Sequence, residues 1–206
     1  SHDFKIQHNG SNTELTNSTG NLVFIQHQDD GDIIFQCDDG SGGTTPYITL
    51  DGGYSTPQVI VPDNVSLVVG SGLDFNIIHN GSNTALTNNT GNLTITNNTD
   101  DGDIIFKSDD GSGGVTEYFR LDGGLSAPFT VFPDDSTAVF GNGFDLRIFH
   151  NASNSFISQE GTGNLYIRNL TDDADIIFQS DDGSGGVTEY FRLDGSAGYT
   201  VASKAI

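Results

Sequence analysis

The sequence predicts an all-β protein made of three tandem copies of one repeat, and three observations support this prediction. First, the segment DFKIQHNGSNTELTNSTGNL, which begins at Asp3, returns in related form at Asp74 and at Asp145, a spacing of 71 residues. Second, short runs rich in Ile, Val, Phe and Thr alternate between apolar and polar positions. Third, many of the 27 glycines, with Asn and Asp, fall between those runs, where the chain must reverse.

The recurrence divides the chain into three repeats, of which the last is truncated: 1–73, 74–144 and 145–206. We interpret the chain as an excerpt of a longer array, because repeat three breaks off before its closing segment. Ser1 and His2 occupy the places that Gly72 and Leu73 hold one repeat later, so we interpret them as the remnant of a tag.

Seven strands are expected in repeat one, at intervals of about ten residues. They cover residues 4–8, 14–17, 21–27, 32–37, 44–50, 58–61 and 65–69. The turn sequences that separate them are, in order, NGSN, STGN, DDGD, DDGSGG, DGG and PDN. Each turn supplies a residue that tolerates positive φ or an Asp or Asn side chain that bonds to the turn backbone.

Alternation along the first strand places Phe4, Ile6 and His8 on one face. The same face recurs in each repeat, and we expect it to form the repeat core: Phe4, Ile6, His8, Phe75, Ile77, His79, Leu146, Ile148 and His150. The opposite face is polar in repeat one but carries Ile78 and Phe149 later, so we expect a second layer or chain there. Strands this short bury little area, which favours stacking or oligomerisation.

These observations favour an elongated tandem β-repeat fibre, most simply an intertwined homotrimer of the β-prism or triple-stranded β type. Tandem small β-sandwiches and a single-chain β-solenoid are the alternatives, because all three architectures satisfy alternation with Gly and Asn turns.

Charge and composition exclude several classes of partner. The chain carries 28 acidic and 7 basic side chains, a net charge of −21, and has no basic patch for nucleic acid or anionic lipid. Its apolar runs are too short to cross a bilayer. Cys37 is replaced by Ser108 and Ser180 in the sibling repeats, so no disulfide framework is expected. Stability must therefore come from packing, including packing between chains.

Two sets of side chains are candidates for metal binding. Three-fold assembly would bring copies of His8, His79 or His150 together, although a ring nitrogen bonded to the following Asn-rich turn is the simpler interpretation. Calcium is the candidate ion for the aspartate-rich turns: Asp30, Asp32, Asp38, Asp39, Asp101, Asp103, Asp109, Asp110, Asp173, Asp175, Asp181 and Asp182. A strand separates the two turns of each repeat, so they cannot share an ion within one chain. Solvated turn chemistry is the alternative.

Carbohydrate chemistry has weaker candidates. Glu117 and Asp122 are candidate acids for glycan hydrolysis. However, repeat one has Pro46 in place of the glutamate, and simple alternation points the two acids to opposite faces. We therefore expect no enzyme. We expect Glu117 to pair with an arginine of a neighbouring repeat or chain. Tyr118 and Tyr190 are candidate glycan contacts on the outer face.

The segments DLRIFHNASNSFI, GTGNLYIRN and DDADIIFQSDDGSGGVTEYFRLDG resemble tandem repeats in tail-fibre and structural proteins of tailed bacteriophages, especially those that infect marine cyanobacteria. The resemblance covers essentially the whole chain, although Asn9, Asn80 and Asn151 stand where the commoner repeat has Asp. It implies an elongated homotrimeric virion fibre that faces the outside and takes part in attachment to the host surface.

We therefore expect the shaft segment of a tail fibre, without a cofactor. Its partner is itself, and other parts of the full protein would meet a host glycan or receptor. The alternative is an adhesin module that is stiffened by calcium or binds carbohydrate.

Overall fold

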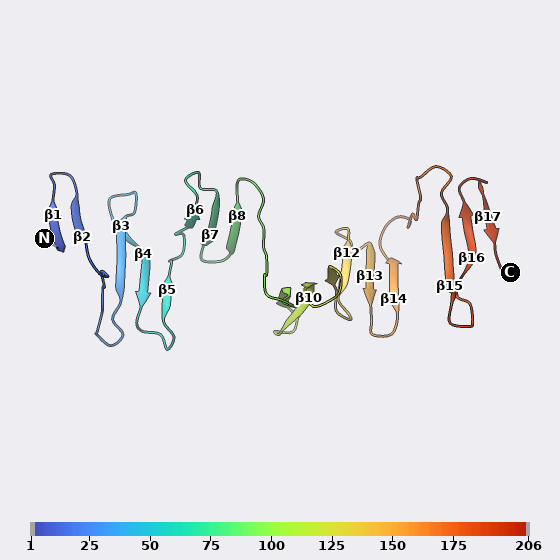
Figure 1. Ribbon diagram of the computed structural model, residues 1–206, viewed down its shortest axis with the longest axis horizontal. Coiled ribbons are helices and arrows are strands. Elements are labelled where there is room, and N and C mark those ends of the chain that lie inside the picture. The colour runs from blue at the N-terminus through green and yellow to red at the C-terminus, as the bar shows by residue number, and fades with distance from the viewer. Residues whose placement is uncertain (1–2, 205–206) are drawn as a thin grey trace. The chain divides into compact units, whose positions relative to one another are not determined.

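The computed structural model describes residues 3–204 of the chain, and within them it contains seventeen β-strands and no helix (Figure 1). The all-β prediction is therefore confirmed. In the described range there is accordingly no apolar helix of the length that a membrane span requires. The predicted tag remnant, Ser1 and His2, lies outside the described residues.

The strands form two structural units, one ending at Ile95 and the other beginning at Thr96. The first unit contains β1 (Phe4–His8), β2 (Thr13–Asn17), β3 (Ile33–Asp38), β4 (Thr44–Asp51), β5 (Gln58–Ile60), β6 (Leu67–Val69), β7 (Phe75–His79) and β8 (Thr84–Asn88). The second contains β9 (Ile104–Asp109), β10 (Val115–Asp122), β11 (Phe129–Val131), β12 (Thr137–Phe140), β13 (Leu146–His150), β14 (Ser155–Gln159), β15 (Ile176–Asp181), β16 (Val187–Asp194) and β17 (Tyr199–Ala202).

All strand pairs are antiparallel, and two kinds of small sheet alternate along the chain. The histidine sheets, named for the histidine that ends one strand of each, are β1–β2, β6–β7–β8 and β12–β13–β14. The aspartate sheets, named for their Asp-rich turns, are β3–β4–β5, β9–β10–β11 and β15–β16–β17. The strands β6 and β12 belong to the end of one repeat but pair with the next, so the sheets do not follow the repeat boundaries drawn from sequence.

Six of the seven strands predicted for repeat one are present, with bounds shifted by no more than two residues. The seventh prediction, a strand over residues 21–27, is wrong for the single chain. Residues 21–27, 92–98 and 164–170, which we call the linking segments, have no strand partner within the described chain and contain neither turn nor bend. In Figure 1 they lie in the stretches of chain that run from β2 to β3, from β8 towards β10 and from β14 to β15.

One turn of each aspartate sheet depends on a glycine. A Cβ atom added to Gly52 would lie 2.5 Å from the carbonyl oxygen of Gly31, and Gly123 and Gly195 are equally close to the backbone of the matching turns. The DGG turn can therefore rest on the preceding DDGD turn only because it has no side chain there.

Each aspartate sheet also contains a β-bulge at its tyrosine. In β10, Glu117 pairs with Lys107 and Phe119 with Phe106, so Tyr118 is an extra residue without a cross-strand partner. The registers of β4 and β16 shift in the same way at Tyr47 and Tyr190. A bulge reverses the face on which the following side chains lie. Alternation counted on the sequence is therefore out of phase after each tyrosine.

None of the described residues is buried, so one chain contains no hydrophobic core. The residues expected to form the repeat core do share a face of the histidine sheets, but Phe4 is 54% and Ile6 64% exposed. A single chain therefore does not bury this face, and the repeat core stays a prediction. A sheet of two or three short strands has two open faces and nothing in the same sheet to cover them.

Candidate functional site

The three predicted histidines lie at matching positions and make the same contact. His8, His79 and His150 each stand opposite a hydroxyl residue across the hairpin, and Nδ1 lies 3.4, 3.0 and 3.0 Å from Oγ1 of Thr13, Oγ1 of Thr84 and Oγ of Ser155. The expected bond to turn backbone is not made, because the turn N–H groups bond to the asparagine side chain instead. In repeat one, Asn9 Oδ1 accepts from the N–H groups of Ser11 and Asn12.

The second aspartate of each DDGSGG turn organises that turn. In repeat two, Asp110 Oδ1 accepts hydrogen bonds from the N–H and Oγ–H of Ser112, both at 2.8 Å, and from the N–H of Gly114 at 3.0 Å. Asp39 and Asp182 do the same in the other repeats. These bonds, chiefly those from the serine, hold the pKa of all three carboxyl groups below the ordinary value of 3.8, because they favour the charged form.

Six more of the predicted aspartates also bond to turns. Asp38, Asp109 and Asp181 each accept a bond from the N–H of the glycine two residues ahead. Asp32 accepts from the N–H of Gly52, and its counterparts Asp103 and Asp175 accept from the equivalent glycines. Among residues 3–204 no three His, Cys, Asp or Glu side chains are grouped so as to hold a metal ion. Most of the predicted calcium ligands thus accept hydrogen bonds from the backbone of a turn. Calcium binding stays a prediction.

In the aspartate sheets of repeats two and three, one arginine contacts three acidic side chains. Arg120 lies 2.9 Å from Glu117, 3.0 Å from Asp122 and 3.3 Å from Asp103. Arg192 makes the same three contacts with Glu189, Asp194 and Asp175. The hydrogen bonds that Arg120 donates to Glu117 and Asp122, and Arg192 to Asp194 and Glu189, raise the pKa of both guanidinium groups.

Two predictions about these acids are therefore corrected. Glu117 and Asp122 lie on the same face rather than on opposite faces, because the bulge at Tyr118 shifts the alternation by one residue. Their arginine comes from the same strand rather than from a neighbouring repeat or chain.

The two tyrosines proposed as glycan contacts are the bulged residues of their strands. The hydroxyl of Tyr118 donates to the carbonyl oxygen of Asp109 at 2.8 Å, and that of Tyr190 to Asp181 at 2.9 Å. Tyr47 makes the same bond in repeat one. Tyr118 is nevertheless 47% exposed.

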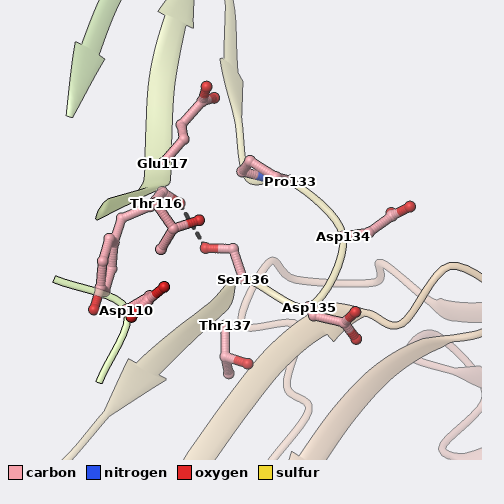
Figure 2. Close-up of a pocket in the computed structure, with 9 residues that line it drawn as sticks. Asp110, Thr116, Glu117, Pro133, Asp134, Asp135, Ser136 and Thr137 are labelled. Atoms are coloured by element: carbon pink, nitrogen blue, oxygen red, sulfur yellow. Dashed lines mark hydrogen bonds between the residues drawn. The ribbon is translucent and has the colours of Figure 1, made fainter. Parts of the chain in front are cut away.

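A shallow groove of about 440 Å³ lies between the β9–β10 hairpin and the loop that leads into β12 (Figure 2). Ser136 donates a 2.5 Å hydrogen bond to the carbonyl oxygen of Tyr118 and ties the two walls together. The groove carries the carboxylates of Asp110, Glu117, Asp134 and Asp135 and no basic side chain. Repeat one has Val65 in place of the serine. The carboxylates of the groove disfavour an anionic ligand. The hydrogen bond between Ser136 and Tyr118 is not shared by all repeats.

Many large apolar side chains are exposed among residues 3–204. Phenylalanine rings stack in pairs across strands, with centroids 4.5 Å apart for Phe106 and Phe119 and 4.8 Å for Phe149 and Phe156. A second hollow, of about 660 Å³, is lined largely by β13 and β14 with Phe132 at one side. Of the residues that line it, Phe156 is 38% and Ile157 64% exposed in one chain.

Comparison of the chain with protein-family models, with curated proteins and with solved structures finds no match. Sequence reasoning identified the histidines, the turn aspartates and the Glu and Arg pair, but missed the bulge and the unpaired linking segments. The tyrosine that recurs in all three repeats in the middle of an alternating run was the one signal for the bulge.

Proposed function

We propose that this chain is a structural shaft segment of a fibre, in which three copies of the chain associate through their apolar sheet faces. In this proposal the groups described above hold turns and hairpins in shape, and they perform no chemistry. The single observation that carries the proposal is the absence of any buried residue among residues 3–204.

The exposed area of the chain indicates how much surface remains to be covered. The chain exposes 16034 Å². Two separate globular units, each of half its mass, would together expose roughly 11,000 Å². The difference of about 5,000 Å² lies at the upper end of the range for permanent interfaces between subunits. Because burial of apolar surface is the main favourable term in folding, association supplies the core that the single chain lacks.

The tail-fibre assignment rests on the resemblance of the repeats to those of tailed bacteriophages. A shaft needs repeated units without a catalytic centre, and the same histidine hairpin and the same aspartate turn recur here in every repeat. In such a fibre the chain would face the outside of the virion and would support attachment to the host, with the receptor contact made elsewhere in the full protein.

A calcium-stiffened or carbohydrate-binding adhesin is the second candidate, and exposed acidic turns with a neighbouring tyrosine favour it. The two functions differ in what stabilises the protein. A shaft is stabilised by apolar contact between chains, whereas an adhesin of independent modules needs its ion.

Light scattering and thermal melting of the purified chain test the proposal. We expect the mass of three chains and one cooperative transition that resists detergent and is unchanged by a chelator. Leu86→Gln, on the apolar face of β8 and 60% exposed in one chain, should weaken the assembly at least ten-fold. Thr87→Gln, on the opposite face, is the matched control and should leave it intact. A monomer whose melting temperature rises with calcium would refute the shaft and support the adhesin.

A further inference from the structure

The linking segments have the sequence pattern of β-strands but no strand partner in the structure. Their sequences are NLVFIQH, NLTITNN and NLYIRNL, rich in residue types that favour strands. All three begin with Asn and Leu. An apolar residue follows two positions after the leucine, and an amide residue follows two positions later again, as in Leu22, Phe24 and Gln26. That period of two belongs to a β-strand.

The amide at the end of each linking segment fixes the start of the next turn. Asn97 donates from Nδ2 to the carbonyl oxygen of Asp103 and accepts at Oδ1 from the N–H of Thr99. Asn169 makes the matching pair of bonds in repeat three. The linking segments are therefore anchored at one end and enter the following aspartate sheet at a defined place.

The main chain ahead of that anchor has no partner. From Asn21 to Ile25, and over the equivalent residues 92–96 and 164–168, neither N–H nor C=O groups bond to any other described residue. Unpaired strand backbone of this kind is a template for pairing with another chain. By contrast, each strand of the six sheets within residues 3–204 pairs with at least one neighbour.

The side chains of the linking segments are also uncovered. Phe24 and Ile25, which alternate onto opposite faces, are 58% and 65% exposed, and in repeat three Tyr166 is 71% exposed. In repeat one the segment therefore carries apolar side chains on both faces, which is typical of a strand that is buried on both sides.

Two properties identify the occupant as another copy of this chain. The linking segments recur every 71 or 72 residues, so a partner that meets all three must carry the same repeat. In a chain of net charge −21 they contain no Asp or Glu, and Arg168 is their only Lys or Arg. Copies of a strongly acidic chain approach each other at least cost where they carry no negative charge.

We propose that the linking segments 21–27, 92–98 and 164–170 form β-ladders with a second copy of the chain, main chain to main chain, and so set the register of the assembly. This inference rests on the self-association proposed above and assigns the segments that hold the copies together.

Proline and alanine variants at one aligned position test the inference. A triple variant Val23→Pro, Thr94→Pro and Tyr166→Pro removes three N–H groups that have no partner within the chain. The matched variant changes the same residues to Ala and keeps the N–H groups. We expect the alanine variant to assemble and the proline variant to associate at least ten-fold more weakly, with the circular dichroism of its sheets retained. Equal association of the two variants would overturn the inference.

Hydrogen exchange of the unmodified protein gives a second measurement that does not depend on a variant. Amides of residues 92–96 have no partner in one chain, so they should exchange at the rate of a free peptide in a monomer and at least a hundred-fold more slowly in the assembly. Fast exchange within a stable trimer would overturn the inference and leave the shaft intact. A protein that is monomeric at every concentration would overturn both proposals.

Discussion

The aspartate sheets of repeats one and two have the same backbone but different side chains. In both, the second and third strands pair in the same register, the tyrosine bulges, and the aspartate turn closes on its own N–H groups. Repeat two adds the Glu117 and Arg120 ion pair, where repeat one has Pro46 and Thr49. It also stacks Phe119 between Phe106 and Phe132, where repeat one has Ile48 and Val61 beside Phe35. The turn and the bulge are therefore common to both sheets, whereas the ion pairs and the aromatic stack are present in repeat two and not in repeat one.

The aromatic stack is the addition whose loss should have the largest effect. Phe119→Ala breaks both ring contacts of repeat two, at 4.5 and 5.8 Å, and removes apolar area. We expect the free energy of unfolding to fall by about 1–3 kcal/mol, because the rings are only partly covered in one chain. Thermal melting measures the change. Phe119→Ile, which restores the residue of repeat one, should lose less than half as much, and an equal loss in both variants would contradict the comparison.

The aspartate turn should come next, because it belongs to the shared scaffold. Asp110→Ala removes the acceptor of three hydrogen bonds, and we expect the melting temperature to fall by a few degrees at neutral pH. Asp134→Ala makes the same change of charge in an exposed loop without breaking a bond found in the structure, and it should be nearly neutral. Comparable losses in the two variants would show that net charge, and not the turn, decides stability.

The stabilising effect of Asp110 depends on pH, because the pKa of its carboxyl group is lowered in the folded chain. Above the ordinary value of 3.8 the carboxyl group is ionised in the folded and the unfolded chain, so its stabilising effect is complete. As the pH falls below 3.8 the unfolded chain takes up the proton first, and the effect is lost as the pH passes the lower pKa of the folded state. The difference in melting temperature between the unmodified protein and Asp110→Ala should shrink over that range. A difference in melting temperature that grows as the pH falls would contradict a lowered pKa for Asp110.

The ion cluster should have the smallest effect. Arg120→Thr with Glu117→Pro reproduces repeat one within repeat two. Because Arg120 and Glu117 are 28% and 24% exposed and their contacts are screened by salt, we expect the melting temperature to change by a degree or so at low salt and less in about 1 M NaCl. Arg147→Thr, which breaks the more exposed pair with Glu160, serves as the control and should have no larger effect. A loss as large as that of Phe119→Ala would make the cluster part of the scaffold.

The site could be predicted from sequence where local chemistry decides it. Asp39 and Asn9 were placed in turns because their side chains bond to backbone within a few residues, and the structure has them there. The partner of Glu117 could not be predicted, because one extra residue at Tyr118 moves Arg120 and Asp122 onto its face. A bulge is a change of register between two strands, and the sequence of one strand does not contain it.

The sequence by itself determined the repeat, the β character, the turns and six of the seven strands of repeat one, because these depend on residue types within a few positions of each other. Only the tertiary structure decided the pairing of β6 and β12 with the next repeat, the phase of side chains beyond each bulge, and the lack of a partner for residues 21–27. The physical reason is that strand pairing is a relation between distant segments. Alternation shows that a segment can pair, whereas the competition among all available edges decides whether it does, and with which chain.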